Sequence, residues 1–132
     1  MLTLVSVLMM AVPVDDRVWV SIDESAIKVG KSYTIGVPSL SVEYAENVPV
    51  PTNDKHMKQV QDACDSSMSD KQLFDWLSRH VAEGKSYAVK PGTNIRVLQI
   101  KPATKTLDVV FLNGRHKGKK AVVTFRTLCE PQ

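Results

Sequence analysis

Short runs of alternating apolar and polar residues, separated by turn residues, fill the chain from Tyr87 to Leu128. A period of two is typical of β-strands that bury one face. We therefore predict a strand-rich region in which apolar side chains turn inward and cations stay outside. In the run 94–100 one face is expected to hold Ile95, Val97 and Gln99, and the other face Arg96, Leu98 and Ile100. The other expected strands cover residues 87–89, 107–112 and 121–125.

The hydrophobic period changes to three or four residues after position 53. It predicts an amphipathic helix over residues 54–63, with an apolar face formed by Met57, Val60 and Cys64. Ser69 is a good N-cap for a second helix, and Gly84 stands where a glycine often ends one. We expect this second helix to cover an open side of the C-terminal β-structure with the side chains of Leu73, Phe74, Trp76 and Leu77.

The residues before the helices predict an N-terminal β segment. Alternation favours strands over 18–22 and 32–37 and a short one over 40–44. The run 47–53 contains two prolines, which lack N–H donors and restrict the residue before each, so we expect an irregular connector there. The fold class is therefore α+β, and the chain divides into an apolar segment, the β segment, a helical segment and a small β-barrel, at residues 1–14, 15–52, 53–84 and 85–132.

The apolar run from Leu2 to Val12 bears on localisation. Its length suits the hydrophobic region of an export signal, but it lacks a positively charged region before it, and Met9 fits poorly before a cleavage at Ala11. It is too short to span a bilayer, so no integral membrane span is expected. The protein is secreted or periplasmic if this run is an export signal, and otherwise cytoplasmic.

Charge is distributed unevenly along the 132 residues, whose 43% apolar and 23% charged content is ordinary for a folded domain. Residues 1–83 hold 7 Lys and Arg against 12 Asp and Glu, a net charge of −5. Residues 84–132 hold 10 against 2, a net charge of +8. Two interpretations follow: the halves pack together and neutralise each other, or the basic half binds nucleic acid or an acidic surface.

The C-terminal pattern resembles bacterial Src-homology-three-like domains. Their Gly-Thr strand, Val-rich strand, Gly-x-x-x-Gly hairpin and closing strand with a one-turn helix are matched by Gly92-Thr93, Val97-Leu98, Gly114, Gly118, Val122 and Leu128. The resemblance implies a small barrel over about 86–128, preceded by the helix that ends at Gly84. The usual Gly-Trp-Val is here Ala121-Val122-Val123, and only Tyr87 and Phe125 supply aromatic rings nearby. Polyproline binding is therefore not expected.

The last hairpin also resembles a KOW motif, found in ribosomal and transcription proteins, except that its second glycine is replaced by Ala121. The Asn113-Gly114 dipeptide predicts a tight turn, and the residues after it are basic. Cations on a rigid turn can contact successive phosphates, although the tip has no aromatic residue that could stack on bases. The candidate ligand-binding residues are Arg115, His116, Lys117, Lys119, Lys120 and Arg126.

Catalytic and metal chemistry find little support in the sequence. The three histidines fall in different elements without metal-ligand spacing. His56 and Cys64 are eight residues apart on one predicted helix, about 12 Å along its axis, which exceeds hydrogen-bond reach. Cys64 and Cys129 either form a disulfide, given an oxidising compartment, or remain buried free thiols.

These observations favour a non-enzymatic binding or accessory module without a cofactor. The first hypothesis is a protein-interaction or envelope-associated adaptor, whose partner is an unidentified protein or polyanion. The alternatives are a nucleic-acid-binding protein that uses the KOW-like hairpin, and a structural subunit of a larger assembly.

Overall fold

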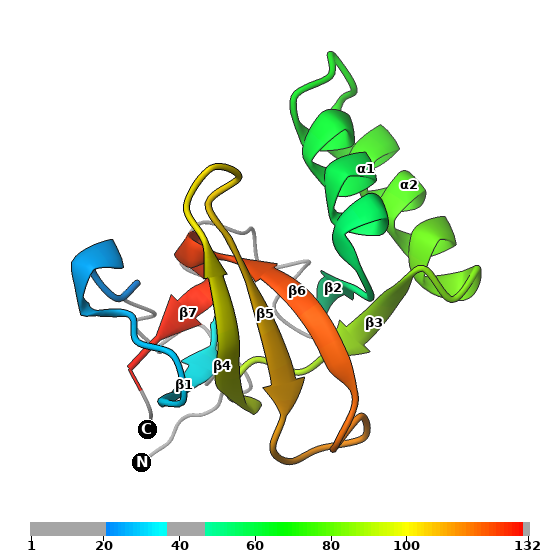
Figure 1. Cartoon of the computed structure of the whole chain (residues 1–132). Coiled ribbons are helices and arrows are strands. Elements are labelled where there is room, and N and C mark those ends of the chain that lie inside the picture. Colours follow the sequence, from blue (N-terminus) through cyan, green and yellow to red (C-terminus); the bar gives the residue numbers. More distant parts are fainter. Residues whose placement is uncertain (1–20, 37–46, 131–132) are drawn as a thin grey trace, which may run out of the picture.

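The computed structural model describes residues 21–36 and 47–130. It is an α+β fold in which a curled antiparallel sheet of five strands forms a half-barrel, beside a two-stranded ribbon and two helices (Figure 1). The elements in chain order are β1 (Ser32–Ile35), β2 (Val48–Pro51), α1 (Asp54–Cys64), α2 (Asp70–Ala82), β3 (Ser86–Val89), β4 (Asn94–Lys101), β5 (Thr106–Phe111), β6 (Lys120–Thr124) and β7 (Leu128–Cys129). One-turn 3₁₀ helices lie at Glu24–Ala26 and Phe125–Thr127.

Three predictions made from the sequence concern residues that lie wholly or mostly outside the described ranges. The apolar segment 1–14, most of the strand expected at 18–22 and the short strand expected at 40–44 lie outside the described residues. Of residues 18–22 only Ser21 and Ile22 are described; Ser21 forms an isolated antiparallel bridge with Cys129, and Ile22 N–H donates to the Leu128 oxygen at 3.0 Å.

The five-stranded sheet has the order β6-β5-β4-β1-β7. β1 lies between β4 and β7, with Tyr33 opposite Ile95 and Ile35 opposite Leu128. The sheet is therefore built from both the 15–52 and the 85–132 parts of the chain, an arrangement that local sequence patterns do not predict.

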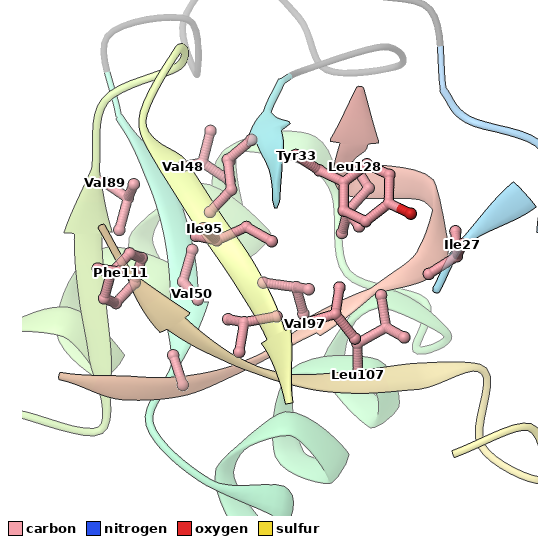
Figure 2. Close-up of a cluster of buried hydrophobic side chains, with 14 of the residues drawn as sticks. Ile27, Tyr33, Val48, Val50, Val89, Ile95, Val97, Leu107, Phe111 and Leu128 are labelled. Carbon is pink, nitrogen blue, oxygen red and sulfur yellow. The ribbon is translucent and has the colours of Figure 1, made fainter. Parts of the chain in front are cut away.

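The predicted alternation is confirmed along β5 and in the first half of β4. Ile95, Val97, Leu107 and Val109 are completely buried, and Phe111 is 1% exposed. These side chains project from neighbouring strands into one cluster on the inner side of the sheet (Figure 2). Each such side chain stabilises the fold by about 1.5–3 kcal/mol relative to an exposed position.

The prediction that Gln99 shares a face with Ile95 and Val97 is wrong. The β4–β5 register shifts between Val97 and Gln99, so one extra residue is inserted into β4 at this point. After such a bulge the alternation is shifted by one residue, so side chains that would have faced inward face outward, and the reverse. Gln99 is consequently exposed, while Ile100 packs against the core.

The prediction of an irregular connector over 47–53 is also wrong. Residues 48–51 form β2, which pairs with β3 in antiparallel register. The Thr52 N–H donates to the Lys85 carbonyl oxygen at 3.1 Å. Because hydrogen-bonded and non-hydrogen-bonded positions alternate, Pro49 and Pro51 occupy the positions whose nitrogens face away from β3. The missing donors therefore remove no bond from the ribbon.

Both predicted helices are confirmed. The Ser69 hydroxyl accepts a bond from the Gln72 N–H, while the Gln72 side chain accepts one from the Ser69 N–H, a complete capping box. Gly84 follows the helix with a φ of +78°, a left-handed conformation that glycine adopts most readily. Within the described residues, neither helix is long and apolar enough to cross a membrane.

The expected packing of the second helix on the C-terminal sheet is not observed. α2 contacts β3, β2 and α1, and Figure 1 shows both helices beside the ribbon, outside the five-stranded sheet. The reason is that β3 pairs with β2 instead of joining that sheet. Of the predicted apolar stripe, Leu77 is buried, whereas Phe74 is 40% exposed.

A matched pair of leucines tests the position of the core. Leu107 is completely buried and Leu98 is 39% exposed. We expect Leu107→Ala to lower the free energy of unfolding by about 2–5 kcal/mol, since it leaves a cavity, and Leu98→Ala to change it by less than about 0.5 kcal/mol. Urea denaturation followed by circular dichroism measures both values, and equal losses would contradict the assignment of the buried face.

Candidate functional site

The predicted basic hairpin is a longer structure than the Asn113-Gly114 signal indicates. β5 ends at Phe111 and β6 begins at Lys120, so residues 112–119 form a loop, hereafter the β5–β6 loop. Two bonds close its base: Phe111 N–H donates to the Lys119 oxygen at 3.0 Å, and Gly118 N–H donates to the Phe111 oxygen at 2.9 Å. Gly114 and Gly118 have φ angles of +80° and +86°, so the loop turns at two places and is not a two-residue hairpin.

The loop is also bound to the start of β4. Leu112 N–H donates to the Asn94 carbonyl oxygen, and Asn94 N–H donates to the Asn113 side chain, both at 2.9 Å. The Thr93 side chain, in the turn between β3 and β4, lies where a Cβ added at Gly114 would meet it at 3.8 Å. A loop fixed by these contacts presents its side chains at defined spacings, which lowers the entropy lost when a ligand binds.

Four cations project into solvent, three in the β5–β6 loop and one at the start of β6: Arg115, Lys117, Lys119 and Lys120. Their side chains have no carboxylate within ion-pair distance in the part of the chain that the structure describes. The same is true of exposed Lys90, which lies in the β3–β4 turn, and of exposed Arg96 on β4. We call these six residues the basic surface: Lys90, Arg96, Arg115, Lys117, Lys119 and Lys120.

The ion pairs within the described residues involve only Lys58, Lys85, Lys101 and Lys105. Lys101 forms ion pairs with both Asp54 at the start of α1 and Asp108 on β5. Burial alone lowers the pKa of the Lys101 ammonium group, but the hydrogen bonds and charges of the two carboxylates outweigh it, and the net shift is upward. Two further pairs join Lys85 to Glu83 and Lys105 to Glu24. The positive charge at the β5–β6 loop therefore remains uncompensated within the described residues.

Arg126 lies apart from the other candidate residues. It belongs to the 3₁₀ helix after β6, whereas the β5–β6 loop precedes β6, so five residues of extended strand separate them. The Ser21 hydroxyl donates to the Arg126 carbonyl oxygen at 2.7 Å. Arg126 is one of the residues that line an apolar groove of about 550 Å³ between β2, α1 and β6. The six candidates thus divide into five at the loop and Arg126 at the far end of the strand.

An aromatic ring from β3 lies against the β5–β6 loop, a contact that the sequence analysis does not predict. Tyr87 on β3 lies against His116 of the loop, with ring centroids 4.6 Å apart and planes inclined by 37°. The Tyr87 ring also meets Phe111 edge-on at 5.6 Å. Both Tyr87 and His116 are partly exposed. Tyr87 is distant from the loop in sequence, so no local pattern indicates this contact.

The basic surface continues from the loop onto the outer face of the sheet. Arg96, Val110 and Lys120 are direct cross-strand neighbours on β4, β5 and β6. Because adjacent strands are about 4.8 Å apart, the backbones of the two cations are separated by about 10 Å. The adjoining residues Ile95 and Ala121 are buried in the core, which places the two cations on the opposite face.

A buried polar network joins the helices to the ribbon. The His80 ring Nε2–H donates to Gln59 Oε1 on α1 at 2.9 Å, and its Nδ1 contacts the Ser86 hydroxyl on β3 at 2.8 Å. Trp76 stacks on the same ring at 4.8 Å. His80 is 4% and Ser86 3% exposed, so both side chains are buried within this network. Their arrangement links α1, α2 and β3.

The remaining candidate chemistry is limited. Cys64 and Cys129 are free thiols in the structure, the first exposed at the end of α1 and the second buried on β7. Partial burial, then the Asp65 carboxylate, raises the pKa of the Cys64 thiol. No three His, Cys, Asp or Glu side chains within the described ranges lie close enough together to hold a metal ion.

Comparison with known proteins gives no relative. No protein-family model, no curated protein and no solved structure shows a significant match to the chain.

The cysteines yield a direct test of the structure. We expect Cys64 to react with Ellman's reagent in the native protein and Cys129 to react only after unfolding, because the second thiol is 1% exposed. Cys64→Ser removes the native reaction. Finding no free thiol in denaturant without reductant would contradict the structure and indicate a disulfide.

The His80 network predicts a pH dependence of stability. Burial, then the charges of His56 and Lys85, lowers the pKa of the His80 imidazole below its ordinary value of 6.5, and Glu83 opposes this. The unfolded chain therefore takes up a proton near pH 6.5 that the folded protein does not, so stability falls as the pH drops below this value.

We expect urea denaturation between pH 7.5 and 5 to show this loss in the wild-type protein and in His116→Asn. The loss should be smaller in His80→Asn, which cannot take up the proton. An identical pH slope in the two variants would contradict the role of His80.

Proposed function

We propose that this chain is a non-enzymatic binding module of the Src-homology-three-like type, and that its basic surface binds an anionic partner. The observation that carries the proposal is the group of exposed cations without carboxylate partners among the described residues, held on a hydrogen-bonded loop. Uncompensated charge on a fixed frame attracts a ligand of opposite sign and speeds its association.

The Src-homology-three-like assignment is supported by local features of the half-barrel. Gly114 and Gly118 stand at the two glycine positions of the family hairpin, and both have the positive φ that favours glycine. β6 is followed by a one-turn 3₁₀ helix and then by β7, as in the closing part of the family pattern.

A binding role also agrees with the surroundings of the reactive side chains. The serine–histidine pair is buried and hydrogen-bonded within the helix–ribbon junction. The exposed Cys64 thiol lies at the end of α1, and its pKa is raised, which disfavours the thiolate. An adaptor that contacts an acidic protein surface or another polyanion needs none of these groups.

Heparin chromatography tests the proposal, with heparin as the polyanion. We expect Lys117→Glu/Lys119→Glu/Lys120→Glu to elute at clearly lower salt than the wild-type protein, because each lost cation–anion contact reduces the number of counterions released. The matched control is Lys55→Glu/Lys58→Glu/Lys71→Glu, which changes the net charge equally at exposed helical positions. Equal shifts for the two triple variants would contradict a specific role for the loop.

A further inference from the structure

We propose that the anionic partner is a single-stranded nucleic acid, which places a base against the Tyr87–His116 ring pair while its phosphates contact the basic surface. This inference rests on the proposed function and adds the class of ligand. It uses the contact between β3 and the β5–β6 loop, in which the Tyr87 ring lies against His116, the residue between Arg115 and Lys117.

The two rings are positioned and supported for stacking. His116 stands between Arg115 and Lys117 in the loop, so cations flank it on both sides along the chain. Tyr87 supports it from β3, and the Tyr87 ring is in turn held edge-on by Phe111, which is 1% exposed. Both members of the pair remain partly exposed. Every base has a π-face, so a ring among cations binds single strands with little dependence on base sequence.

Further cations follow in the chain and in the sheet. Lys90 follows Tyr87 by three residues in the β3–β4 turn, and Asn94, directly after this turn, is hydrogen-bonded to Asn113 of the loop. Lys120 begins β6 at the end of the loop, and Arg96 lies in register with it on the outer face of the sheet. A flexible phosphodiester chain can therefore contact cations before and after the base that meets the rings.

The ring pair is what distinguishes this ligand from other polyanions. An acidic peptide is bound by charge, and its carboxylates gain nothing from an aromatic face. A duplex keeps its bases stacked on one another, so it offers the loop only its phosphates. A single strand uses both the cations and the rings, and for this reason the observations favour it.

The experiment compares two 12-residue strands of equal charge, oligo-dT and an abasic oligodeoxyribose phosphate, by fluorescence anisotropy at low salt. We expect the wild-type protein to bind oligo-dT about tenfold more tightly than the abasic strand, within the range found for stacking one base. The difference should fall towards onefold in Tyr87→Leu and in His116→Ser. Tyr87→Phe, which keeps the ring, should preserve it, and unchanged binding of the abasic strand by Tyr87→Leu and His116→Ser shows that these variants are folded.

The outcomes separate the two proposals. Equal binding of the two strands, with both weakened by Lys117→Glu/Lys119→Glu/Lys120→Glu, overturns the base contact and leaves the anionic surface in place. Competition by polyglutamate or a 12-base-pair duplex that equals oligo-dT likewise overturns the inference, in favour of an acidic protein or a duplex. If neither strand binds and the triple variant leaves heparin elution unchanged, the proposed function itself fails.

Discussion

The pairing of β1 with both β4 and β7 is the interaction on which the sheet depends. Tyr33 and Ile35 enter the core from β1, and the Tyr33 hydroxyl donates to the Ala26 oxygen at 3.1 Å and accepts from Lys28 N–H at 2.9 Å. Opposite Tyr33 stands Ile95, 62 positions later in the chain. Without this strand β4 would have an open edge, β7 would have no partner in the sheet, and the frame that carries the β5–β6 loop would lose one wall of its core.

The two helices and the buried face of β5 could be predicted from the sequence, because residues close together in the chain determine them. The helix boundaries follow from the Ser69 cap and the spacing of apolar residues, and the buried face of β5 follows from strict alternation. The β2–β3 ribbon could not be predicted, because prolines disfavour strands in general and are tolerated here only through the register with a distant strand. The bulge at Gln99 depends in the same way on the partner strand.

Some residues of the candidate site could likewise be predicted from local sequence, and others could not. The cations of the loop are contiguous in the sequence and were predicted as a group. The Tyr87 ring reaches His116 only because β3 leaves the five-stranded sheet and pairs with β2, and Arg126 is carried away from the loop by the length of β6. Arg96 joins the basic surface through the cross-strand register, which no local pattern specifies.

The prolines of β2 have a consequence for how the molecule meets copies of itself. A strand whose outer edge keeps its carbonyl groups but lacks N–H donors cannot complete a ladder with a strand from another chain. In the described part of the fold that edge of β2 pairs with no other strand, and its two missing donors are those of Pro49 and Pro51. This edge of β2 therefore resists pairing with a strand from another chain, a protection that the fold obtains from the two residues that most strongly disfavour a strand.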